Sequence, residues 1–296
     1  MTLGPRMLVF HAGALGDHVL LWPLLRTLAR DGHRVALVSD AAKARLAARA
    51  IGVEPIDVEQ PRWRRLWIPS AAPSPRPAGE PDTTVIYSTL HAPDDPGFAA
   101  WAAAARAATG ATHVHAIGPP GSPSREALWA RLQIPLRGIV APRSNLAGPI
   151  VLHAGAGSPV KRWPLDNLIA LSERLASAGR PTHLIAGEVE AERFSTDDRQ
   201  AFAAAGGELL STLEELYERL NAAAGFVGAD TGPTHLSAQL GLPTVALFGP
   251  TDPAIWAPIG PGVRVIAPDV PQPMSWLAVP LVCSTLETLL EPPSSG

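Results

Sequence analysis

The stretch FVGADTGPTHLSAQLGLPTVALFGPTDPAIWAP, residues Phe226–Pro258, has the pattern of a buried strand, a sharp loop, a short helix and a second buried strand. The apolar runs Phe226–Ala229 and Pro243–Phe248 are long enough for strands, and the turn residues Asp-Thr-Gly-Pro end the first of them. Between them, Thr234–Leu240 has helical spacing and is followed by Gly241. Two buried strands joined through a helix form the repeating unit of a parallel α/β sheet.

Polar residues collect at one end of these two strands. Ligands of open α/β sheets bind beyond the carboxyl ends of the strands, and a helix that starts there offers free backbone N–H groups to an anion. The stretch therefore predicts a phosphate site. The polar residues in question are Asp230, Thr231, Thr234, His235, Thr251 and Asp252.

The same alternation of strands and helices extends in both directions along the chain. We expect strands at Met7–His11, His33–Ser39, Thr84–Ser88, His113–Ile117, Ile150–His153, His183–Ala186 and Val263–Ile266. We expect helices at Val19–Arg30, Phe98–Ala108, Leu165–Ala178, around Glu190–Ala204, around Leu213–Ala223 and at Cys283–Leu290. Two consecutive α/β halves indicate two Rossmann-like domains facing each other across a cleft.

A domain boundary is expected in APRSNLAGP, residues Ala141–Pro149, which gives domains at 1–147 and 148–296. The segment 68–81 contains five prolines and is expected to be an extended surface loop.

The composition limits the class of protein. The 296 residues are 46% hydrophobic, enough for two cores. The one cysteine, Cys283, excludes an internal disulfide and a cysteine-based metal site. No secretory leader or stretch of about 20 apolar residues is apparent, so we expect a cytoplasmic protein.

The net charge of −3 conceals an asymmetry between the halves. Residues 1–147 carry 16 Lys and Arg against 11 Asp and Glu, a net charge of +5, and residues 148–296 carry 8 against 16, a net charge of −8. The basic half could attract an anionic partner, although arginines scattered over solvated faces explain the count equally simply.

Two loops carry candidate catalytic residues. Asp17 ends the glycine-bearing loop His11–Asp17, and it is either an N-cap of the following helix or a general base that removes a hydroxyl proton. Lys161 lies in HAGAGSPVKRWP, residues His153–Pro164, where glycines permit close approach to an anion. The alternative there is a connector with a solvated lysine.

Further candidates have equally ordinary alternatives. Three arginines interleaved with tryptophans in PRWRRLW could clamp phosphates or carboxylates, or form a solvated loop anchored by one tryptophan; they are Arg62, Arg64 and Arg65. Glu190 could accept hydrogen bonds from a ribose, or simply begin a helix. His235 alone would be a partly buried helix residue. No His, Asp or Glu grouping has metal-ligand spacing, so we predict no metal site and no cofactor.

Four segments together resemble glycosyltransferase family 9, the ADP-heptose:lipopolysaccharide heptosyltransferases. They are GALGDHVLLWPLLRTL from Gly13, PRWRRLW from Pro61, AGAGSPVKRWP from Ala154 and DTGPTHLSAQLGLPTVALFGPTDPAIWAP from Asp230. The last of these is the most specific. The segment Val85–Pro96 departs from the family's acceptor-side pattern, so the acceptor stays open.

The resemblance implies a GT-B fold and an enzyme that transfers a sugar with inversion and without a metal. The first domain would take the acceptor, with Asp17 as base and the three arginines on an anionic glycolipid. The second would bind the nucleotide sugar, expected to be ADP-heptose: Lys161, Thr231 and Gly232 at the diphosphate, Asp230 and His235 at the sugar, Glu190 at the ribose, with Thr251 nearby. The expected location is the cytoplasm, with peripheral contact at the inner membrane, and no nucleic-acid partner.

Three alternatives stay open on the sequence alone. One is a transferase of the same fold with another nucleotide sugar, or with a protein or natural-product acceptor. The others are a UDP-sugar epimerase and a nucleotide-binding module without catalysis.

Overall fold

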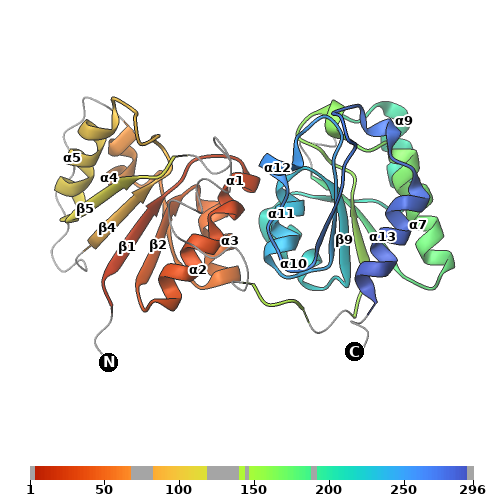
Figure 1. Ribbon diagram of the computed structural model, residues 1–296, viewed down its shortest axis with the longest axis horizontal. Coiled ribbons are helices and arrows are strands. Elements are labelled where there is room, and N and C mark those ends of the chain that lie inside the picture. Colours follow the sequence, from red (N-terminus) through yellow and green to blue (C-terminus); the bar gives the residue numbers. More distant parts are fainter. Residues whose placement is uncertain (1–3, 68–82, 119–139, 144–146, 188–191, 292–296) are drawn as a thin grey trace. The chain divides into compact units, whose positions relative to one another are not determined.

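The computed structural model describes residues 4–67, 83–118, 140–143, 147–187 and 192–291. The chain divides into two compact units, Met1–Ile139 and Val140–Gly296. Each unit has its own parallel sheet (Figure 1). The proline-rich segment 68–81 and Glu190 lie outside the described residues.

The first unit contains a five-stranded parallel sheet in the order β3-β2-β1-β4-β5. Its strands are β1 (Arg6–Phe10), β2 (Arg34–Ser39), β3 (Glu54–Asp57), β4 (Thr83–Ser88) and β5 (His113–Ala116). Its helices are α1 (Leu15–Leu20), α2 (Trp22–Arg30), α3 (Ala41–Ile51), α4 (Pro61–Arg64) and α5 (Phe98–Thr109), and α4 continues into a 3-10 turn, η1 (Arg65–Trp67). The strand order reverses between β1 and β4, which marks the switch point where ligands bind in open α/β sheets.

The second unit contains a six-stranded parallel sheet in the order β11-β10-β9-β6-β7-β8. Its strands are β6 (Ile150–His153), β7 (Thr182–Gly187), β8 (Glu208–Leu210), β9 (Gly225–Ala229), β10 (Thr244–Leu247) and β11 (Val263–Ile266). Its helices are α7 (Leu165–Ser177), α9 (Thr196–Ala204), α10 (Leu213–Asn221), α11 (Gly232–Gln239), α12 (Pro253–Trp256) and α13 (Val279–Leu290). Short 3-10 turns occur at η2 (Pro159–Lys161) and η3 (Met274–Trp276). Here the order reverses between β6 and β9.

Helices cover both faces of the second sheet. In Figure 1, α7, α9 and α13 lie on one side of β9, and α10 and α11 lie on the other. The larger core joins the buried faces of β6, β9 and β10 to leucines of α7 and to the apolar side of α13. This packing explains the near-continuous apolar runs in the sequence, because a strand covered on both faces has no polar side.

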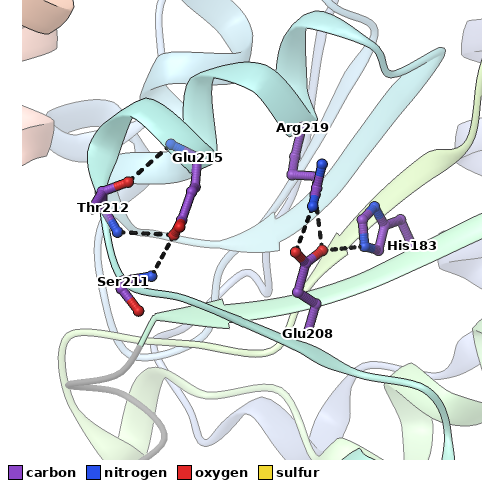
Figure 2. Close-up of polar contacts among 6 residues, drawn as sticks. All are labelled: His183, Glu208, Ser211, Thr212, Glu215 and Arg219. Carbon is purple, nitrogen blue, oxygen red and sulfur yellow. Dashed lines mark hydrogen bonds and ion pairs between the residues drawn. The ribbon is translucent and has the colours of Figure 1, made fainter.

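Edge strand β8 is tied to its neighbours by the polar contacts in Figure 2. Arg219 of α10 donates two hydrogen bonds to Glu208, at 2.8 and 2.5 Å, and His183 of β7 lies 2.6 Å from the same carboxylate. The hydrogen bond from Arg219 is the main cause that holds the pKa of Glu208 below its usual value. The contacts join β7, β8 and α10 at the exposed edge of the sheet.

Several predicted elements have different bounds in the structure. The helix expected at Val19–Arg30 is two helices, α1 and α2, because Pro23 in the first turn of α2 has no N–H to continue the α1 ladder. The charged helix expected around Glu190–Ala204 begins only at Thr196, where Ser195 accepts a hydrogen bond from Asp198 N and caps it. The last helix begins at Val279, four residues before Cys283.

No helix in the described part of the chain combines the length and the apolar character that crossing a membrane requires.

Candidate functional site

The loop between β6 and α7 presents Lys161 beside the switch point of the second sheet. Trp163 is buried, and its indole Nε1 donates a hydrogen bond of 3.0 Å to Leu277 O, far along the chain. This anchor fixes the loop two residues after Lys161, which ends the turn η2. The lysine therefore projects from a fixed segment, with its side chain 30% exposed.

The Lys161 ammonium makes an ion pair with Asp230, the residue after β9. Lys161 Nζ donates to Asp230 Oδ2 at 2.9 Å, and the aspartate side chain is only 8% exposed. His235 of α11 places Nε2 3.8 Å from the other carboxylate oxygen, Oδ1, which is longer than a hydrogen bond. Three of the predicted site residues thus meet in one cluster.

Asp230 is ionised in this setting although it is buried. Burial is the largest single influence and raises the pKa of the carboxyl group, but His235 and Lys161 together outweigh it and leave the pKa below the ordinary value. The cluster therefore holds a carboxylate next to an ammonium group.

The start of α11 leaves backbone donors available next to this cluster. Thr231 occupies the N-cap position but its side chain does not cap the helix. Its hydroxyl instead donates to the carbonyl oxygen of Ala229, the last residue of β9, at 3.3 Å. Thr234 also donates to Ala229 O, at 2.5 Å. Gly232 is the first residue of the helix. The N–H groups of an uncapped helix start suit an anion such as phosphate.

Thr251 follows β10, the strand next to β9. Its hydroxyl oxygen is buried and has no hydrogen-bond partner among the described residues. The following residue, Asp252, accepts a hydrogen bond from Ala254 N at 2.8 Å and caps α12.

Asp17 lies at the switch point of the first unit, within the first turn of α1. The interpretation of Asp17 as an N-cap is wrong, because α1 begins at Leu15 and Ala14 occupies the N-cap position. The sequence predicted a helix from Val19, but helical backbone already begins at Leu15, four residues earlier. Asp17 therefore does not occupy the N-cap position of this helix.

His11 was not a candidate in the sequence, yet both His11 and Asp17 lie beside Gly13. The Thr89 hydroxyl donates to Phe10 O at 3.1 Å and so accepts from His11 Nδ1 at 2.9 Å. Burial, assisted by the charge of Lys43, lowers the pKa of His11 to about 4, so the ring is neutral at pH 7. A single histidine after a strand gives no signal in the sequence that its ring is buried and neutral.

Gly13 keeps the space between His11 and Asp17 open. A side chain at Gly13 would place its Cβ 3.1 Å from His11 Nε2 and 3.5 Å from Asp17 Oδ2. The imidazole and the carboxylate therefore lie on the same side of this glycine, and the first of these distances is too short for comfortable packing.

The basic segment after β3 divides into anchored and exposed residues. Trp63 is buried and packs edge-on against Phe10, with ring centroids 5.6 Å apart. Arg62 lies 4.3 Å above the Trp63 ring and donates to Ala108 O at 2.5 Å, so it ties α4 to α5. Arg64 and Arg65 are exposed. Of the three arginines, these two are accessible to a partner.

The predicted site residues thus fall into two groups, one in each unit. Lys161, Asp230, His235, Thr231 and Gly232 lie at the switch point of the second sheet, with Thr251 at the end of the adjacent strand. Asp17 and the arginines belong to the first unit. In the described ranges no group of three or more His, Cys, Asp or Glu side chains could hold a metal ion.

Comparison with known proteins finds a similar family for the segment that contains Lys161, Asp230 and His235. Residues 133–274 match the model of glycosyltransferase family 9 (heptosyltransferase). A stretch of 127 residues is 34% identical to lipopolysaccharide heptosyltransferase 1 of Pseudomonas aeruginosa. That stretch covers 41% of this chain and 34% of the relative, so the match spans about a third of the relative's length.

Solved structures resemble the whole chain. The heptosyltransferase WaaC of E. coli, solved with ADP, is 20% identical, with a TM-score of 0.66 over 96% of this chain and 99% of that chain. A glycosyl transferase family 9 protein from Veillonella parvula is 15% identical, with a TM-score of 0.68 over 98% of each chain. The likeness covers both units and confirms the expected GT-B fold class. The match to glycosyltransferase family 9 covers residues 133–274, the part of the chain that contains Lys161, Asp230 and His235.

Proposed function

We propose that this protein is an inverting glycosyltransferase that moves a heptose from ADP-heptose to a hydroxyl group of a lipopolysaccharide inner-core acceptor. The observation that carries the proposal is the cluster of Lys161, Asp230 and the uncapped start of α11, inside the segment that matches the family. The P. aeruginosa relative is named a lipopolysaccharide heptosyltransferase, and the E. coli neighbour was solved with ADP.

In this proposal the second domain, residues 148–296, binds the nucleotide sugar. Lys161 and the backbone N–H groups of Thr231 and Gly232 contact the diphosphate and stabilise the charge that develops on it as it leaves. No metal ion is needed for that step. Asp230 and His235 contact the sugar, Glu190 the ribose and Thr251 the adjoining part of the donor.

The first domain, residues 1–147, supplies the acceptor side of the reaction. Asp17 takes the proton of the acceptor hydroxyl while that oxygen forms a bond to the anomeric carbon. The bond from the anomeric carbon to the diphosphate oxygen breaks on the opposite side, which inverts the configuration. Arg64 and Arg65 contact an anionic glycolipid at the cytoplasmic face of the inner membrane, and Arg62 holds their helix against α5.

Binding measurements test the donor first. Calorimetric titration with ADP, UDP and GDP, without added metal and followed by ADP-heptose, should show selective binding of ADP. Selective binding of UDP or GDP would move the function to another sugar transfer or to an epimerase. Binding of none of the three would contradict the donor assignment.

Two substitutions separate the roles of the domains. Asp17→Asn should keep ADP binding and lose about two to four orders of magnitude in turnover, which is the range of a lost general base. Lys161→Ala should weaken ADP binding by at least about tenfold, because the diphosphate loses a charged contact. Unchanged turnover in D17N, or an unaltered dissociation constant in K161A, would remove that residue from its proposed role.

A further inference from the structure

The cation assigned to the donor diphosphate already has a partner within the protein. Lys161 Nζ lies 2.9 Å from Asp230 Oδ2, and the carboxylate is almost fully buried. We infer that Asp230 is a specificity-determining residue. Its ion pair with Lys161 weakens the binding of anions without a sugar, and a diphosphate that carries a sugar can separate the pair at lower cost. The inference rests on the proposed function and names the ligand feature that the site selects.

The geometry fixes both members of the pair. Trp163 anchors the loop of Lys161 through its hydrogen bond to Leu277 O, and Asp230 follows the central strand β9 directly. His235 faces the second carboxylate oxygen at 3.8 Å. The pair is therefore built into the switch point and does not depend on two freely moving side chains.

An anion that takes Lys161 away from Asp230 leaves a buried carboxylate without its ammonium partner. Such a carboxylate is costly, because a buried charge that loses its counterion retains its desolvation penalty. The anion also brings its own negative charge close to Asp230. Both effects weaken the binding of phosphate, diphosphate or a nucleoside diphosphate.

A sugar attached to the diphosphate changes this balance. Its hydroxyl groups can donate hydrogen bonds to the released carboxylate, and hydrogen bonds to an ionised acceptor are among the stronger ones in proteins. The cost of separating the ion pair is then offset only for a nucleotide sugar. The same arrangement favours release of the nucleoside diphosphate after transfer, because the product lacks the hydroxyl donors.

The neighbouring residue supplies a matched control. Arg162 donates to Asp198 of α9 at 2.7 Å, and both side chains are about one quarter exposed, at 24% and 26%. This ion pair starts from the same loop as that of Lys161 but does not involve the cation assigned to the diphosphate. Asp198→Asn therefore removes a carboxylate from the same region without freeing Lys161.

The experiment compares the affinities of the full-length protein for ADP and for ADP-heptose by calorimetry. Asp230→Asn should bind ADP at least about fivefold more tightly than the unsubstituted protein, because Lys161 loses its competing anion. ADP-heptose should bind no more tightly than before, so the preference for the sugar nucleotide falls. Asp198→Asn should leave both affinities within about twofold.

Two further variants make the outcome decisive. Asp230→Ser, which also removes the charge, should reproduce the tighter ADP binding if the asparagine variant fails to fold. Lys161→Gln in the D230N background should abolish the gain. Equal or weaker ADP binding in D230N would overturn the inference and leave Asp230 as a residue that only positions Lys161. Failure of the unsubstituted protein to bind ADP-heptose would instead contradict the proposed function.

Discussion

His11 and His18 are neutral imidazoles in the interior of the first unit, on either side of Asp17 in the sequence. Their ring centroids lie 5.7 Å apart, and His18 packs edge-on against Trp22 at 6.3 Å. Burial is the main cause that lowers the pKa of His11 to about 4 and that of His18 to about 3. Below pH 6.5 both imidazoles are charged in the unfolded chain, so each must release a proton when the chain folds.

This arrangement predicts a loss of stability in acid. Because the folded-state pKa values are depressed, the unfolded chain binds more protons than the folded one as the pH falls below 6.5, and stability declines through that window toward pH 3. His18→Phe removes one such group. Near pH 5 it should reduce the dependence of the unfolding free energy on pH by about 1.4 kcal/mol per pH unit.

Denaturant unfolding at several pH values between 4 and 7.5 measures this effect. At pH 7 the phenylalanine variant should be about as stable as the unsubstituted protein, since one buried neutral ring replaces another and the contact with Trp22 is kept. His113→Gln, which replaces a histidine at an exposed position of β5, serves as the control. An unaltered slope in H18F would contradict the neutral state of His18.

Individual residues differ in how far the sequence predicts them. That Asp230 and His235 lie at the carboxyl edge of the second sheet was predictable from the order of apolar strand, turn and helix, whereas Lys161 was equally compatible with a solvated connector. His11 was not predictable, because its state depends on a hydrogen bond to Thr89, 78 residues away, and on burial. The position of a functional side chain can be predicted from the sequence only when the neighbouring residues determine it.

At the scale of elements, helix α10 is held by a capping box, shown in Figure 2. Thr212 accepts a hydrogen bond from Glu215 N at 3.1 Å, and the Glu215 carboxylate accepts from Ser211 N and Thr212 N at 2.7 and 3.1 Å. The helix follows edge strand β8 and carries Arg219, which holds Glu208 of that strand. The cap therefore supports the edge of the sheet as well as the helix.

Thr212→Ala should lower the free energy of unfolding by about 1 kcal/mol, the usual cost of a lost N-cap. Thr288→Ala is the control, because Thr288 lies on the exposed side of α13 and only donates to Ser284 O within the helix. That control should change stability by less than about 0.5 kcal/mol. Equal losses in the two variants, measured by urea unfolding, would show that the capping box contributes nothing specific.

Element type was more predictable than element bounds. The alternation of apolar runs with amphipathic segments predicted most strands of both sheets, but strands β3 and β8 and helices α3, α4 and α12 were not predicted. Helix α3 is rich in alanine and arginine, so its apolar stripe is weak, although Asp40 caps its start and Gly52, at φ 74°, ends it. Capping contacts such as these become visible only when the backbone is known.

At the scale of the whole molecule, each unit has a core of its own. The core of the first unit joins β1, β2, β4 and β5 to α4 and α5, and that of the second joins β6, β9 and β10 to α7 and α13. The two sets of buried residues have no member in common. The sequence predicted two α/β halves, but not the strand orders, because periodicity does not say which strands are neighbours.

Separate cores predict that donor binding stabilises one unit without the other. A ligand that binds only the folded second unit raises its unfolding free energy by about 2.7 kcal/mol at a concentration 100 times the dissociation constant. ADP should therefore slow hydrogen exchange at the amides of β6, β9 and β10 and leave exchange at those of β1, β2 and β4 unchanged. A Lys161→Ala variant that binds ADP about tenfold more weakly should keep only about 1.4 kcal/mol of this stabilisation at the same ADP concentration. Equal slowing in β1 and β9 would mean that the two cores unfold as a single cooperative unit.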